Sequence, residues 1–236
     1  MPHTPHTHTH TEKHFGASDL VRDVVIGMAD GLTVPFALAA GLSGAVAASG
    51  LIVTAGVAEI AAGAIAMGLG GYLAARGDAE HYAKERKRER YEISALPEEE
   101  EEEIVGIFAR YGLTRAQCAP ILATFHKDHD AWVDFMMRYE LGLEHPVPGR
   151  ALKSACTIGT AYVIGGLVPL IPYMLIPQPR TALWISAVAT LVALAVFGAI
   201  KGRYAGTGAR RGAVQTVVVG GIAACAAFFL ASLVAG

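Results

Sequence analysis

The fold is decided by residues 24–75, which read VVIGMADGLTVPFALAAGLSGAVAASGLIVTAGVAEIAAGAIAMGLGGYLAA. The only ionisable side chains in this stretch are Asp30, Glu59 and Tyr72. A single helix of about 50 residues would be about 75 Å long, at about 1.5 Å per residue. Because the hydrocarbon core of a bilayer is about 30 Å thick, the stretch predicts two membrane-spanning helices.

Most of the remaining charge in this 236-residue chain lies in one block. Residues 76–153 hold 28 of the 40 Asp, Glu, Lys and Arg side chains. Three apolar segments follow, at residues 151–176, 181–200 and 212–235, and each is long enough to span a membrane once. The sequence therefore predicts an all-α, polytopic membrane protein with five transmembrane helices.

The same pattern predicts a small helical domain inserted between the second and third transmembrane helices. The expected division is a disordered His- and Thr-rich tail at 1–18, transmembrane helices one and two at 19–78, the inserted domain at 79–149, and helices three to five at 150–236. The tail has no apolar region of its own, so we do not expect a cleaved signal peptide.

Basic residues in the short connections predict the orientation. They lie before the first span and between the fourth and fifth spans, at Lys13, Arg22, Lys201, Arg203, Arg210 and Arg211. The connection between the first two spans and the C-terminus carry no charge. We therefore expect the N-terminus and the inserted domain to be cytoplasmic and the C-terminus to be lumenal.

Within the insert, the sequence predicts helices separated by clear breaks. No proline occurs from Leu51 to Ser94, so the second span is expected to continue out of the membrane until Pro97. Pro97 and the acids after it are typical of a new helix start. Thr114 and Gln117 have the spacing of a capping box, and a further helix is expected at 128–141.

The acidic residues of the insert repeat at helical spacing. Glu85, Glu89 and Glu92 share one face of the long helix, and Glu100 and Glu103 share a face of the next. Neighbouring arginines make a solvated, charge-compensated helix one interpretation. The other is that carboxylates from two helices bind a divalent cation such as Fe²⁺ or Mn²⁺, with a sulfur ligand from Met136 or Met137.

Asp30 and Glu59 are far from the ends of their spans. A carboxylate at bilayer depth costs at least ~2.5 kcal/mol, and such residues usually face a cavity or a partner. Pro35 removes the hydrogen bond to the Gly31 carbonyl beside Asp30, which outlines a cation site. Met67 is either a soft ligand or a packing residue. Because a metal must displace the carboxylate proton, metal and proton would compete for one site.

The run from Asp23 to Gly44, DVVIGMADGLTVPFALAAGLSG, resembles the vacuolar iron transporter family, most closely its plant-type members. The segment from Glu59 to Gly71, the acidic insert and the five-span layout share the resemblance. It covers nearly the whole chain after the N-terminal tail. It implies a homodimeric antiporter that moves Fe²⁺ into the vacuole in exchange for protons, through a pore lined by the first two spans of both subunits.

By motif position the resemblance assigns Asp30, Glu59 and Met67 to the translocation path. It assigns the following residues to a cytoplasmic metal site: Glu89, Glu92, Glu100, Glu103, Met136 and Glu140. Iron is expected as substrate and bound ion rather than as a cofactor, with Mn²⁺, Co²⁺, Ni²⁺ and Zn²⁺ as further candidates. Metal ions, protons, membrane lipid and a second copy of the chain are the expected partners, and nucleic acid is not. The resemblance also implies a location in the vacuole membrane and a role in iron storage.

Three alternatives come from other classes of protein or substrate. A di-iron enzyme is not expected, because no glutamate here is followed three residues later by the histidine that such sites use. A membrane-anchored metal sensor or binding scaffold would not need acids inside the membrane. A transporter of Mn²⁺ or of divalent cations in general is the nearest alternative.

Overall fold

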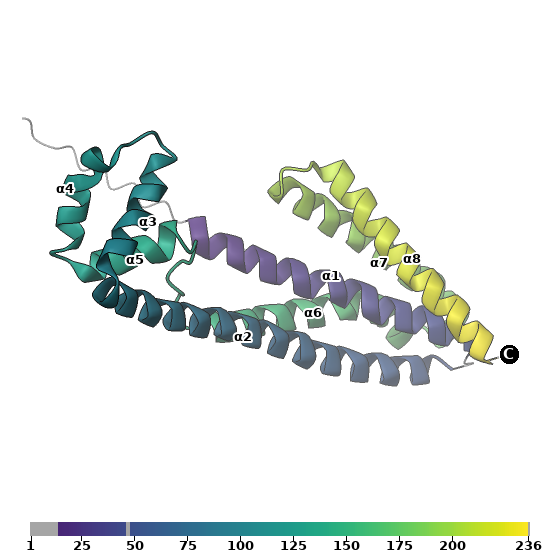
Figure 1. The fold of residues 1–236 in the computed structure, drawn as a ribbon. Helices are drawn as coiled ribbons and strands as arrows, with labels where there is room; N and C mark the ends of the chain where they lie inside the picture. The colour runs from purple at the N-terminus through teal and green to yellow at the C-terminus, as the bar shows by residue number, and fades with distance from the viewer. Residues whose placement is uncertain (1–13, 46–47, 236) are drawn as a thin grey trace, which may run out of the picture. The chain divides into compact units, whose positions relative to one another are not determined.

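The computed structural model describes residues 14–45 and 48–235, and in this part of the chain all regular secondary structure is helical. The helices are α1 (His14–Ala45), α2 (Ser49–Ala95), α3 (Pro97–Ala109), α4 (Arg115–Phe125), α5 (His129–Tyr139), α6 (Arg150–Leu175), α7 (Pro179–Tyr204) and α8 (Ala209–Ala235). Five of these, α1, α2, α6, α7 and α8, are long and apolar enough to cross a membrane. The prediction of an all-α protein with five spans is confirmed at this level, and Figure 1 shows the helices in chain order.

The helix boundaries follow the breaks in the sequence. Helix α2 runs without interruption to Ala95, and Pro97 occupies the first turn of α3, where its missing N–H costs nothing. Helix α1 begins at His14, inside the segment expected to be a tail, and residues 1–13 lie outside the described residues. Pro35 lies inside α1, which nevertheless stays helical to Ala45.

The chain divides into two compact units. The first, here called the membrane unit, comprises Met1–Tyr72 and Leu152–Gly236. The second, here called the inserted unit, comprises Leu73–Ala151. The apolar half of α2 belongs to the membrane unit, and its charged half, which begins near Arg76, belongs to the inserted unit.

In the membrane unit, glycines allow the helices to approach closely. A Cβ atom at Gly27 or Gly31 of α1 would lie 2.3 Å from a backbone oxygen of α6, at Ile158 or Tyr162. Helices α7 and α8 form a hairpin that contacts α1, as Figure 1 shows. Large apolar side chains such as Trp184 and Leu175 remain exposed, which suits a surface facing lipid.

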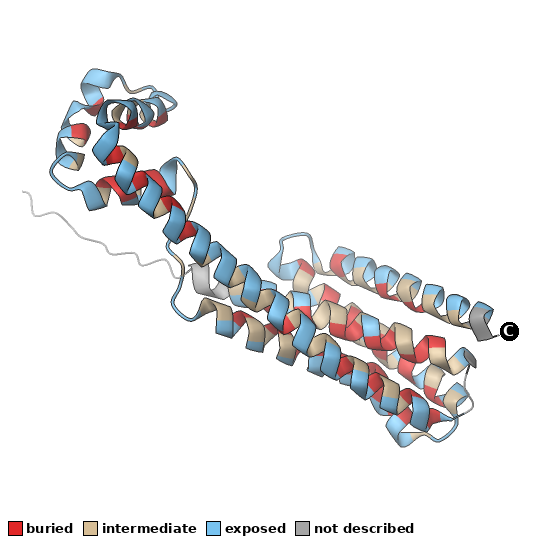
Figure 2. Ribbon diagram, turned by 60° about the horizontal axis from the view of Figure 1, so that its bottom comes forward, coloured by how far each residue is buried: buried red, intermediate tan, exposed pale blue. Residues whose placement is uncertain are grey.

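The inserted unit is built around a cluster of buried apolar side chains. Trp132 and Val133 of α5 and Ile104 of α3 are fully buried in it, together with Met136 and Met137. Figure 2 shows buried positions on the inner faces of these short helices. Thr114 and Gln117 make the capping box that the sequence predicts, and in addition Asp128 caps α5 by accepting a hydrogen bond from the Ala131 amide.

Candidate functional site

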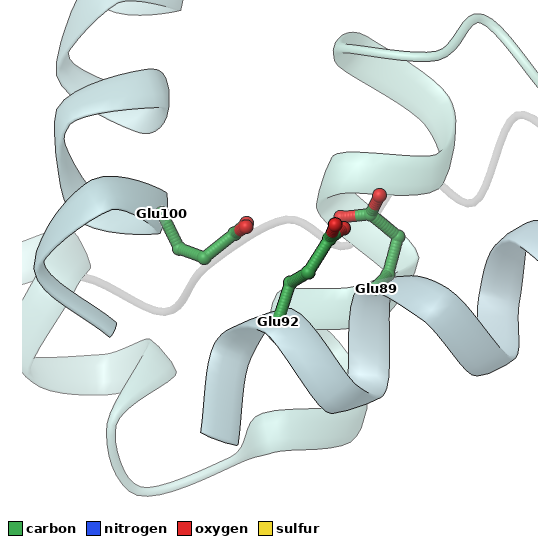
Figure 3. Close-up of side chains that lie close together, drawn as sticks. All are labelled: Glu89, Glu92 and Glu100. Atoms are coloured by element: carbon green, nitrogen blue, oxygen red, sulfur yellow. The ribbon is translucent and has the colours of Figure 1, made fainter. Parts of the chain in front are cut away.

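Three glutamates of the inserted unit point toward one another. Glu89 and Glu92 come from the last turns of α2, and Glu100 comes from the first turn of α3 (Figure 3). One carboxylate oxygen from each lies within 4.8 Å of the others. Opposite ligands of an octahedral ion with bonds of about 2.1 Å lie about 4.2 Å apart. The three carboxylates therefore have nearly the separation that one divalent cation requires.

Burial makes two of these carboxylates costly to leave unneutralised. Glu89 is 1% exposed and Glu100 is 5% exposed. The Oε2 atom of each is buried and has no hydrogen-bond partner among the described residues. An ionised oxygen in that position loses hydration that no described residue replaces. The cluster is therefore expected to hold a proton or a cation.

The electrostatics agree with this expectation. Burial, followed by the negative charges of Glu103 and Glu89, raises the pKa of Glu100 to about 8. Burial also raises the pKa of Glu89, in the charged half of α2 beyond the apolar stretch, and the charge of Glu92 adds to this effect. Near neutral pH the cluster consequently binds protons that an incoming cation would displace.

Glu103 and Glu140 extend the cluster. Glu140 lies at the C-terminal cap of α5 and is exposed as a residue, but its carboxyl is partly withdrawn from water. This withdrawal, followed by the charges of Glu103 and Glu89, raises the pKa of Glu140 to about 7. A hydrogen bond between the carboxyl groups of Glu103 and Glu140 acts in the same direction. Acids from α2, α3 and α5 thus face one region.

Helix phase separates four of the six consecutive glutamates into two pairs. Glu100 and Glu103 face the cluster, whereas Glu101 and Glu102 pair with Arg115 of α4. Glu101 also contacts His126, at 2.7 Å. The acidic run is therefore only partly a solvated surface. Glu101 and Glu102 hold α3 against α4, and Glu100 and Glu103 face the candidate metal ligands.

The arginines of α2 are sorted in the same way. Arg86 and Arg90 pair with acids of α5, at Asp134 and Asp130. Arg88 instead contacts the glutamates on its own helix. Among the described residues, Arg88 is therefore the basic side chain that compensates the charge of the acid cluster.

The predicted sulfur ligand, Met136, lies among buried apolar side chains. Met136 is fully buried in the hydrophobic cluster of the inserted unit, one turn before Glu140, whose amide donates to the Met136 carbonyl at 3.0 Å. Met137 is equally buried. The structure thus places both methionines in the core beside the helix end that presents Glu140.

In the membrane unit, Glu59 of α2 has a partner that the sequence did not predict. The Tyr162 hydroxyl of α6 donates to Glu59 Oε1 at 2.5 Å, and Glu59 Oε2 is buried without a partner in the described chain. Gly63, one turn after Glu59, makes room for the phenol, because a Cβ there would lie 2.4 Å from the Tyr162 oxygen. A tyrosine in mid-span beside small residues is the signal that could have identified it.

Asp30 and Met67 are both half-buried in the membrane unit. Asp30 is adjacent to Gly31, whose close approach to the Tyr162 carbonyl brings α1 against α6. Met67 follows Glu59 by two turns on α2. The polar groups of α1, α2 and α6 are therefore arranged around Tyr162, with Met67 further along α2.

Five long apolar helices, with Asp30 and Glu59 inside the apolar stretches of two of them, define a polytopic helical membrane protein. A family model described as "VIT family" matches residues 21–232. The chain is 56% identical to "Vacuolar iron transporter 1" of Arabidopsis thaliana, over 95% of this chain and 90% of that protein. It is 55% identical to "Vacuolar iron transporter 2" of Oryza sativa subsp. japonica, over 95% and 92% of the two chains. It is 40% identical to "Protein CCC1" of Saccharomyces cerevisiae, over 91% and 69%. The chain belongs to the VIT family, among its plant-type members.

Proposed function

We propose that this protein transports ferrous iron from the cytosol into the vacuole in exchange for protons. Relatives that are 55–56% identical over nearly the whole chain are named vacuolar iron transporters, which supports the substrate and the location in a vacuole membrane. The observation that carries the mechanism is the buried, unpartnered oxygen of Glu59 within an apolar helix. A transporter accounts for this carboxylate, whereas a membrane part that only anchors a scaffold has no need of it.

The translocation path is assigned to Asp30, Glu59 and Met67. Tyr162 fixes one oxygen of Glu59 through its hydroxyl and leaves the other free to bind a proton or a metal ion. Because a metal ion binds only the deprotonated carboxylate, arrival of Fe²⁺ releases a proton and arrival of a proton releases Fe²⁺. With a vacuole more acidic than the cytosol, this competition drives iron into the vacuole and protons into the cytosol.

The path is completed by a second copy of the chain. Small residues of α2, including Ala58, Ala61, Ala62 and Gly70, are exposed. Such residues let two helices approach closely in a membrane. We place α1 and α2 of two subunits around a shared pore, with the N-terminus and the inserted unit cytoplasmic and the C-terminus lumenal.

The inserted unit gathers metal on the cytoplasmic side. Its ligands are proposed to come from Glu89, Glu92, Glu100, Glu103, Glu140 and Met136. Carboxylate oxygens suit Fe²⁺ and Mn²⁺, and a thioether adds preference for a transition metal over Mg²⁺ or Ca²⁺. In this assignment the acid cluster binds cytosolic iron, and the two membrane acids move it across.

The test is uptake into proteoliposomes that contain the purified protein and report internal metal and internal pH. Fe²⁺ uptake is expected to require an acidic interior and to be accompanied by a rise in internal pH. Equal uptake without a pH gradient would indicate a channel, and absence of uptake would reject the transport proposal. Parallel assays with Mn²⁺ and Zn²⁺ distinguish an iron transporter from a general divalent-cation transporter.

A further inference from the structure

The Arg88 side chain contacts three carboxylates of its own helix, α2. Its Nη1 atom lies 2.7 Å from Glu85, its Nε atom 3.1 Å from Glu92, and its Nη2 atom 3.4 Å from Glu89. Two of these acids, Glu89 and Glu92, belong to the three-carboxylate cluster. The guanidinium therefore neutralises part of the charge that a metal ion would use.

A divalent cation and this guanidinium would compete for the negative charge of Glu89 and Glu92. Glu92 offers Oε2 and Glu89 offers Oε1 to Arg88. An ion bound to the same carboxylates would place two positive charges side by side in a partly desolvated region, which is unfavourable. Binding of the ion is consequently favoured when Arg88 gives up its contacts with Glu89 and Glu92.

Glu85 gives the displaced side chain a place to stay. It lies one turn before Glu89 on the same helix, outside the three-carboxylate cluster, and makes the shortest of the three Arg88 contacts. Glu85 is 8% exposed, whereas the Arg88 side chain is 49% exposed and has room to turn. Arg88 can thus retain one ion pair while it leaves the other two.

We propose that Arg88 is a tethered counter-ion that competes with metal for Glu89 and Glu92 and retreats to Glu85 when metal binds. The inference rests on the proposed metal site of the inserted unit. Arg88 is not a ligand in this scheme, but a residue that sets the affinity of the site. Weakened affinity is useful in a protein that must release the metal it collects.

The first experiment is calorimetric titration of the full-length protein in detergent with Mn²⁺, at about pH 8, where protons compete least. Arg88→Gln is expected to tighten binding by about tenfold, since ion pairs with a half-exposed partner are individually weak but metal binding no longer has to break the two with Glu89 and Glu92. Glu85→Gln is expected to weaken binding, because the displaced Arg88 then has no alternative partner. Arg86→Gln, the matched control, removes an arginine two residues away that pairs with α5, and it is expected to leave the affinity unchanged.

The outcomes separate this inference from the proposed site. Unchanged or weaker binding in Arg88→Gln, with normal binding in the unsubstituted protein, overturns the role of Arg88 and leaves the metal site standing. Absence of Mn²⁺ binding in the unsubstituted protein rejects the site itself. A change of equal size in Arg86→Gln would show a general charge effect and would also overturn the inference.

Thermal unfolding provides a readout that does not depend on the titration. If Arg88 acts only while its carboxylates are free of metal, Arg88→Gln lowers the unfolding temperature without added metal and has little effect at saturating Mn²⁺. A purely structural arginine would lower the unfolding temperature equally in both conditions, and that result would overturn the inference. Arg88→Lys, which keeps the charge, is expected to restore most of the metal-free stability.

Discussion

The two units of this protein bury carboxylates in opposite ways. In the membrane unit, Glu59 has one neutral donor, the Tyr162 hydroxyl, and helix packing through glycines holds that donor in place. In the inserted unit, Glu89, Glu92 and Glu100 face one another, and Arg88 is their nearest positive charge. A single acid in an apolar helix is suited to passing one ion or proton at a time. Crowded acids in a polar unit are suited to attracting cations.

The largest effect is expected from Asp30→Asn, which removes the charge from the membrane acid but keeps its size. Because a bound cation at bilayer depth needs a compensating charge, uptake of Fe²⁺ into proteoliposomes should fall to the level of protein-free vesicles. Binding of Mn²⁺ to the inserted unit of the same variant should be unchanged. Normal uptake would remove Asp30 from the path, and loss of both properties would indicate a folding defect.

The close approach of α1 and α6 is tested by Gly31→Ala. The added methyl group would lie 2.3 Å from the Tyr162 carbonyl oxygen, so the two helices must separate. Overpacking of this kind costs about 1–3 kcal/mol, and the shift would also move the Tyr162 hydroxyl away from Glu59. We expect a lower unfolding temperature in detergent and reduced uptake.

Gly221→Ala is the matched control for that prediction. Gly221 lies in apolar helix α8, and an added Cβ would have no described atom within 4 Å beyond its chain neighbours and the nearby backbone of its own helix. The alanine is therefore expected to leave stability and uptake unchanged or slightly improved. If the two variants behave alike, close packing at Gly31 is not what positions Tyr162.

The acid cluster is tested by comparing two neighbours in the same glutamate run. Glu100→Gln removes a buried carboxylate that faces Glu89 and Glu92, whereas Glu98→Gln makes the same chemical change at an exposed position. Mn²⁺ affinity is expected to fall about tenfold or more, or about 1.4 kcal/mol, in the first variant and little in the second. Equal effects would favour a diffuse negative surface over a defined site.

The sequence was sufficient for most of the fold because the relevant signals are local. The shortage of charge from residue 24 to 75 predicts two spans, and Pro97, Thr114 and Asp128 mark where helices begin. These signals depend on composition and capping within a few residues. They can consequently be recognised in the sequence without knowledge of what the helices pack against.

The sites were less predictable because they depend on contacts between distant residues. The spacing of Glu89, Glu92 and Glu100 left both a solvated surface and a metal site open, and the turn at Pro97 is what brings the three together. Tyr162 contacts Glu59 across 103 positions of sequence, so periodicity could not associate them. Arg88 differs from Arg86 and Arg90 only in helix phase relative to α3 and α5.

The smallest effect is a pH dependence that should belong to the inserted unit. The pKa values of Glu100 and Glu140 are raised to about 8 and about 7, so the folded protein holds protons that the unfolded chain releases near the ordinary value of 4.5. The contribution of these two groups to stability without added metal is therefore full below about pH 4.5 and is lost progressively as the pH rises toward about 8. Thermal unfolding between about pH 5 and about pH 8 should show a fall of a few degrees in the unfolding temperature of this unit.

Glu100→Gln cannot ionise at that position, so it should flatten the pH dependence. Saturating Mn²⁺ should reverse it, because metal binds the deprotonated carboxylates. A slope that is the same in Glu100→Gln would assign the pH dependence to groups outside the cluster.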